Sequence, residues 1–171
     1  MSLRKKKHRV PFFLIILLVA YPVFAETTAI RAGNLVDSVS GTIAKNQIIL
    51  VKDGKIVEVG PKVNIPAGAE VIDLSSAWVM PGLMDAHTHM TFDFQTAGAS
   101  IEATYLKEST ATRAFRGLRN AQDLLHAGFT TVRDVGNDAN YAAVDLRNAI
   151  NKGWFTGPTI LTSGKINTPF G

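Results

Sequence analysis

Between residues 27 and 80 the apolar positions fall in short runs rich in β-branched residues, bounded by Gly, Pro and Asp. Runs of this kind predict strands. The predicted strands are residues 29–32, 47–51, 55–59 and 70–74. The second and third flank Asp53 and Gly54, a pair suited to the positive φ angles of a tight hairpin turn. The segment therefore predicts a small antiparallel sheet or one half of a β-sandwich.

After Pro81 the pattern changes to apolar strands that alternate with amphipathic helices. The predicted strands are residues 83–87, 129–133 and 159–162, and the predicted helices are residues 109–127 and 138–152. In the first helix the apolar residues that recur at helical spacing are Ala111, Ala114, Phe115, Leu118, Ala121 and Leu125, with Arg113, Arg116, Asn120 and Asp123 on other faces. We expect Asp138 to cap the second helix, and Gly128 and Gly153 to end the two helices. This alternation predicts βα units around a parallel sheet.

The basic residues are concentrated at the start of the chain. The chain has a formal net charge of +4, but five of its 18 Lys and Arg residues lie within the first nine positions. The remainder carries 13 basic and 14 acidic side chains. Because the body is not basic, the charge gives no indication of a nucleic-acid partner. His8 belongs to the same cationic start.

Residues 1–25 have the three parts of a secretory signal. The cationic start is followed by an uncharged apolar run, and Val23 and Ala25 supply small residues before Glu26. The uncharged stretch contains Pro11 and Pro22 and falls short of the roughly 20 apolar residues that a spanning helix needs. We therefore expect cleavage after Ala25 and export to the periplasm or the extracellular space, with no stable membrane anchor. The chain contains no cysteine, which excludes disulfides, thiol catalysis and cysteine metal ligands.

His87 and His89 are the candidate metal ligands. They are two residues apart at the end of a predicted strand, where alternation places both imidazoles on one face. Such a pair can bind one ion, although two ordinary hydrogen-bonded imidazoles at a strand end have the same spacing. The pair alone is weak evidence for a metal site.

Three sequence segments, taken together with the hairpin VKDGKI (51–56), resemble the amidohydrolase superfamily. They are VMPGLMDAHTH (79–89), AGFTTVRD (127–134) and GPTILTSG (157–164). The last is most similar to the imidazolonepropionase-like branch, which includes Xaa-Pro dipeptidases. The resemblance extends from about Ala29 to Gly171.

This resemblance implies a (β/α)₈ barrel of the TIM type beside a small β-sandwich. It also implies that His87 and His89 bind a divalent metal, most often zinc, as one or two ions. In such enzymes the metal activates water to attack an amide or related carbonyl, and an acidic residue moves the proton. The family's other ligands are a lysine, two histidines and an aspartate from later strands, and they have no counterpart before Gly171. The implied substrate is a small molecule or peptide.

Several other residues invite a functional interpretation. His126 ends a predicted helix, where interaction with the helix dipole is the simpler account. Asp85 falls on the same predicted face as the histidines and either orients an imidazole or makes a structural hydrogen bond. A local ion pair is the economical interpretation of Arg133 and Asp134. Phe92 and Phe94 follow the first barrel strand and either line a substrate pocket or pack beneath their loop.

The sequence thus predicts a signal peptide at 1–25, a β-sandwich segment at 26–80 and an incomplete barrel at 81–171. About three of the eight strands are present, since a complete barrel takes about 250 residues. Two hypotheses follow. The chain is the N-terminal part of a metal-dependent hydrolase of amide or other C–N bonds and is inactive alone, or it is a non-catalytic remnant or interaction module of the same fold.

Overall fold

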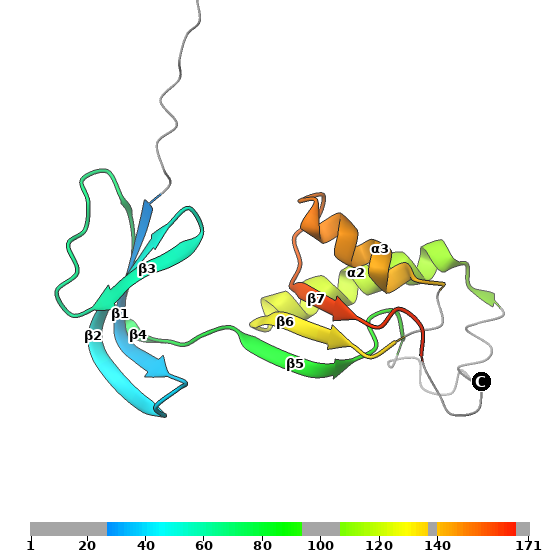
Figure 1. Ribbon diagram of the computed structural model, residues 1–171, viewed down its shortest axis with the longest axis horizontal. Coiled ribbons are helices and arrows are strands. Elements are labelled where there is room, and N and C mark those ends of the chain that lie inside the picture. The colour runs from blue at the N-terminus through cyan, green and yellow to red at the C-terminus, as the bar shows by residue number, and fades with distance from the viewer. Residues whose placement is uncertain (1–26, 94–106, 137–139, 167–171) are drawn as a thin grey trace, which may run out of the picture. The chain divides into compact units, whose positions relative to one another are not determined.

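The computed structural model describes residues 27–93, 107–136 and 140–166, which fall into two compact units (Figure 1). The predicted signal peptide lies outside these ranges, as do Asp138 and Phe94. Within the described ranges no helix is both long and apolar enough to cross a membrane.

The first unit is a four-stranded sheet. Its strands are β1 (Thr27–Asp37), β2 (Thr42–Lys52), β3 (Lys55–Gly60) and β4 (Glu70–Val79), in the order β3-β2-β1-β4. The hairpin of β2 and β3 is antiparallel, and Asp53 and Gly54 at its turn have φ angles of 50° and 72°. Positive φ at both central residues is what a two-residue turn of this kind requires, which confirms the prediction.

Of the two alternatives predicted for this segment, the small antiparallel sheet is wrong for one strand pair, and the half of a β-sandwich stays a prediction. β4 pairs with β1 in parallel, from Thr28 opposite Glu70 to Leu35 opposite Val79. The reason is the connection after β3: residues 61–69 carry the chain past β2 to the far side of β1, whereas a hairpin would have placed β4 beside β3. Local turn signals reveal a hairpin but not a crossover of this length.

The second unit is a βα arrangement with a parallel sheet. Its elements are β5 (Leu83–Thr88), α2 (Thr110–His126), β6 (Phe129–Asp134), α3 (Ala142–Asn151) and β7 (Thr159–Thr162). The strands lie in the order β5-β6-β7 and both pairs are parallel, as predicted. Both helices lie on one face of this sheet (Figure 1).

The core of this unit lies between the sheet and its two helices. Its buried residues are Met90, Ala121, Val132, Leu146 and Ile160. Strands β6 and β7 and both helices each contribute one of these residues, and Met90 comes from the segment just after β5. This places the residues that follow the histidine pair inside the core, so the packing of the unit fixes the backbone beside the site.

Helix α2 begins and ends where the sequence predicts. The Ser109 hydroxyl accepts a hydrogen bond from the Thr112 amide, and Gly128 with a φ of 95° follows the last turn. Its buried face differs from the expected one, because Phe115 is 70% exposed whereas Arg113 is buried. Arg113 can be buried because its guanidinium donates to the carbonyl oxygen of Glu108.

Helix α3 is shorter than expected. It begins at Ala142, and its N-cap is Tyr141, which has a left-handed backbone and no capping side chain. Asp138 is therefore not the cap of this helix. The C-terminal end agrees with the prediction, since Gly153 follows the cap residue with a φ of 72°.

Candidate metal site

The two candidate ligands lie at the carboxyl end of β5. His87 is within the strand and His89 follows its last residue, and their ring centroids are 5.3 Å apart with planes at 74°. The structure thus brings together the two imidazoles that the sequence singled out. The carboxyl ends of parallel strands are where barrel enzymes place functional groups.

Strand β5 is irregular around His87. Asp85 pairs with Val132 and Thr88 pairs with Asp134, so three steps along β5 match two along β6. The extra residue breaks the simple alternation of β5, yet Asp85 and both histidines line the same pocket. Bulges of this kind re-aim side chains next to active sites.

Asp85 makes a structural hydrogen bond. Its carboxylate accepts from the backbone amide of His87 at 2.9 Å. Of the two roles left open for Asp85, the structure shows this one. The bond joins the Asp85 side chain to the His87 backbone within the irregular stretch of β5.

His89 is held on two sides. Its Nδ1 atom lies 2.6 Å from the carbonyl oxygen of Gly136, in the segment after β6. The Phe92 ring stacks on the imidazole with centroids 5.0 Å apart and 13° between the planes. Phe92 therefore packs against the candidate ligand, while Phe94 lies outside the described residues.

Arg133 and Asp134 do not form the expected ion pair. Arg133 is exposed and donates from Nε to the carbonyl oxygen of Ala86 at 2.7 Å. Asp134 is fully buried, and its carboxylate accepts from the backbone amides of Met90 and Gly136 at 3.1 and 2.8 Å. The two side chains are on opposite faces of a strand because they are adjacent in sequence.

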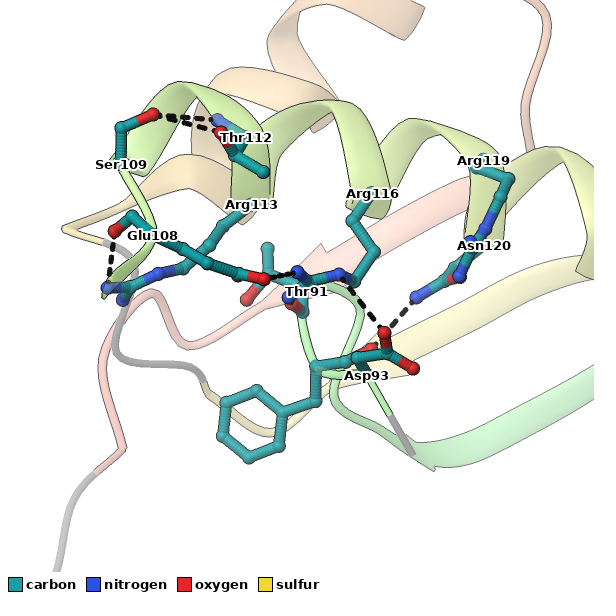
Figure 2. A network of polar contacts seen from close by, with 10 residues as sticks. Thr91, Asp93, Glu108, Ser109, Thr112, Arg113, Arg116, Arg119 and Asn120 are labelled. Carbon is teal, nitrogen blue, oxygen red and sulfur yellow. Dashed lines mark hydrogen bonds and ion pairs between the residues drawn. The ribbon is translucent and has the colours of Figure 1, made fainter. Parts of the chain in front are cut away.

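Helix α2 anchors the segment that follows the histidines. Asn120 donates from Nδ2 to the carbonyl oxygens of Met90 and Phe92 at 2.9 and 3.1 Å. Arg116 donates to the carbonyl oxygen of Thr91 at 3.2 Å and pairs with the carboxylates of Glu108 and Asp93 (Figure 2). The helix thus fixes the backbone immediately after His89.

A pocket of about 380 Å³ opens beside these residues. Both histidines line it, as do residues of α2 and of the segment after β5. Those with charged or amide side chains are Asp85, Asp93, Arg119, Asn120 and Asp123. Its size is within the range of small-molecule sites.

The remaining histidine of the described residues, His126, is exposed in the last turn of α2, in agreement with the helix-dipole interpretation. In the described part of the chain no group of three or more His, Cys, Asp or Glu side chains is placed to hold a metal ion. The histidine pair therefore offers two ligands. Zinc sites usually have four, of which a catalytic site leaves one to water.

Comparison with known proteins agrees with this fold. Residues 78–168, more than half of the chain, match the amidohydrolase family. The chain therefore belongs to the amidohydrolase family, whose members are generally metal-dependent hydrolases.

Two relatives illustrate the range of the family. A dihydroorotase of Pelotomaculum thermopropionicum is 48% identical over 61 residues, which are 36% of this chain and 14% of that protein. An imidazolonepropionase of Methylobacterium nodulans is 32% identical over 126 residues, which are 60% of this chain and 32% of that protein.

A solved structure is similar over most of the chain. The crystal structure of a Xaa-Pro dipeptidase with methionine bound in its active site is 34% identical, with a TM-score of 0.72. The match covers 82% of this chain and 34% of that one. This chain thus spans about a third or less of the length of each of these three proteins.

Proposed function

We propose that the protein contributes the first metal ligands of a hydrolase that acts on amide or other C–N bonds of small peptides or cyclic amides. The observation that carries the proposal is the pair His87 and His89 at the carboxyl end of β5, with the His89 ring held by Gly136. The match of residues 78–168 to the amidohydrolase family supports it.

The donor atoms of this pair suit a divalent metal such as zinc. A carbonyl oxygen can only accept a hydrogen bond, so the neutral His89 ring carries its hydrogen on Nδ1 and its lone pair on Nε2. Metal-binding histidines usually donate their second nitrogen in this way. Two imidazole nitrogens suit zinc better than a hard cation such as Mg²⁺, which prefers oxygen ligands.

A bound metal ion would polarise the substrate carbonyl and make water nucleophilic at neutral pH. The protein's own residues would hold and orient the two imidazoles. The sequence has four histidines, and the other two are His8 in the proposed leader and the exposed His126. We therefore propose that further metal ligands, the proton-transfer acid and much of the substrate pocket come from barrel strands other than β5, β6 and β7.

For the architecture we propose that β5, β6 and β7 are the first three strands of a (β/α)₈ barrel spanning residues 81–171 in this chain. Residues 26–80 would belong to a small β-sandwich. The parallel order β5-β6-β7 with both helices on one face supports the barrel, because a (β/α)₈ barrel repeats that unit with its helices outside.

For the location we propose export to the periplasm or the extracellular space after removal of residues 1–25. The cationic start, the short apolar run and the small residues at Val23 and Ala25 support it. N-terminal sequencing of the protein exported by a bacterial host should begin at Glu26. An intact Met1 in a membrane-embedded product would refute cleavage.

The activity is tested with a panel of dipeptides, including Xaa-Pro substrates, and cyclic amides such as dihydroorotate. The 171-residue chain should hydrolyse none of them. A longer form that supplies all eight strands should hydrolyse at least one, and a chelator should abolish that turnover. Chelator-sensitive turnover by the short chain would contradict the proposed ligand count, and no turnover by the long form would favour a non-catalytic module.

A further inference from the structure

Asp134 is a buried carboxylate with two backbone partners. It lies at the end of β6 and is 0% exposed. Its Oδ2 accepts from the Met90 amide at 3.1 Å, and its Oδ1 accepts from the Gly136 amide at 2.8 Å. A buried carboxylate is costly unless its oxygens are hydrogen-bonded, and these two amides satisfy one bond to each oxygen.

Both amides belong to backbone next to His89. Met90 follows His89 in the chain, and Gly136 supplies the carbonyl oxygen that lies 2.6 Å from Nδ1 of the His89 ring. A further hydrogen bond from the Val135 amide to the Thr88 carbonyl joins the same two segments at 3.0 Å. Asp134 thus fixes both the backbone that carries the imidazole and the backbone that receives its hydrogen bond.

The conformation of Gly136 is special to glycine. Its φ is 120°, and a Cβ atom there would lie 2.7 Å from the backbone Cα and N of Ile166. Such a φ is accessible to glycine at little cost but strained for other residues. The direction of the Gly136 carbonyl therefore depends on a backbone that few sequences can adopt.

We propose that Asp134 is a positioning residue for His89, and that it selects the imidazole tautomer that presents Nε2 to a metal. This proposal rests on the proposed function in naming the metal. The selection of the tautomer itself depends only on the contacts of Asp134, Gly136 and His89. Asp134 would act through the Gly136 carbonyl and would not be a ligand.

The isosteric variant Asp134→Asn separates this role from simple packing. The Met90 and Gly136 amides donate to different oxygens of Asp134, and in asparagine one of these oxygens becomes an NH₂ group, which donates and cannot accept. The side-chain volume is nearly unchanged, whereas one of the two hydrogen bonds from the Met90 and Gly136 amides is lost. Asp145→Asn is the matched control, because Asp145 is an exposed carboxylate of the same unit on α3.

The first measurement is long-range ¹H–¹⁵N NMR of the imidazoles in the full chain at alkaline pH, where the rings are neutral. In the unchanged chain His89 should have its hydrogen on Nδ1. In Asp134→Asn it should populate both tautomers, and Asp145→Asn should match the unchanged chain. If the unchanged chain carries the His89 hydrogen on Nε2, the proposal is overturned, whether or not any variant folds.

The second measurement is the affinity for zinc alone, by competition with a chromophoric chelator. Asp134→Asn should weaken binding about 10- to 100-fold, as loss of a supporting hydrogen bond does at other metal sites. If folded Asp134→Asn keeps the same His89 tautomer and the same zinc affinity, the positioning role is overturned. If His87→Ala also loses zinc in that case, the metal site still stands. A shifted tautomer in a chain that binds no zinc would leave the positioning role standing and overturn the metal.

Discussion

The ring of Phe92 stacks on the imidazole of His89, with centroids 5.0 Å apart and 13° between the planes. The phenyl ring is only three residues further along the chain, and the Phe92 amide donates to the His89 carbonyl at 3.1 Å. The two rings therefore meet across a tight turn. This turn makes one face of the candidate ligand apolar, while its Nδ1 edge meets the Gly136 carbonyl.

Phe92→Leu should lower the free energy of unfolding by about 0.5–1.5 kcal/mol, the usual contribution of an aromatic pair beyond its buried area. Phe92→Tyr keeps the ring and should lie close to the unchanged chain. Urea denaturation measures both. Equal midpoints for all three proteins would show that the stack contributes nothing to stability.

Asn120→Ala should destabilise the βα unit by about 1–3 kcal/mol, because it leaves the half-buried carbonyl oxygens of Met90 and Phe92 without their side-chain donor. Asn148→Ala on α3 is the control, because that side chain is exposed and, among the residues that the structure describes, accepts hydrogen bonds from its neighbour Arg147 alone. Thermal unfolding of the two variants should differ clearly. If Asn148→Ala lowers the thermal midpoint as much as Asn120→Ala does, the hydrogen bonds from Asn120 to the segment after β5 do not contribute specifically to stability.

Gly54→Val should destabilise the first sheet by about 1–3 kcal/mol, since a β-branched residue is strained at the φ of 72° observed there. The strain is not a steric clash with other residues, because a Cβ at this position would meet nothing within 4 Å. Gly60→Val, at a position without positive φ, is the control for adding a β-branched side chain to the same hairpin. A thermal midpoint for Gly54→Val equal to that of the unchanged chain would contradict the turn assignment.

Ser40→Ala should raise the pKa of Asp37. The Ser40 hydroxyl, followed by the Val39 and Ser40 amides, lowers that pKa from its ordinary value of 3.8. A lowered pKa in the folded state means that the turn gains stability above about pH 3.8 and loses it as the pH falls through the folded pKa. NMR titration of the Asp37 carboxyl carbon measures the change, and the pKa of Asp73, which Ser75 lowers independently, should not move.

The elements that could be predicted from the sequence depend on local signals. The Asp53–Gly54 turn and the strand at 159–162 agree with the structure because turn chemistry and apolar runs act over a few residues. The same is true of Gly128 at the end of α2. The parallel pairing of β1 with β4 depends on where a longer connection leads, and no local pattern encodes it.

In the site, spacing alone predicted the nearness of His87 and His89, but not what holds them. Asp134 contacts a residue 44 positions away, and His89 contacts one 47 positions away. Asn120 was assigned to a polar face of its helix, although it donates to the segment after the histidines. The sequence signal for the turn that holds His89 was Gly136, two residues after Asp134 at the end of the strand.

The central claim is that His87 and His89 bind a metal, and zinc titration of the full chain by calorimetry tests it most directly. The chain should bind one zinc ion weakly, because two imidazoles fill half of the usual four positions. Binding should be lost in His87→Ala and in His89→Ala and retained in His126→Ala and His8→Ala. Equal binding by all four variants would contradict the assignment of this site.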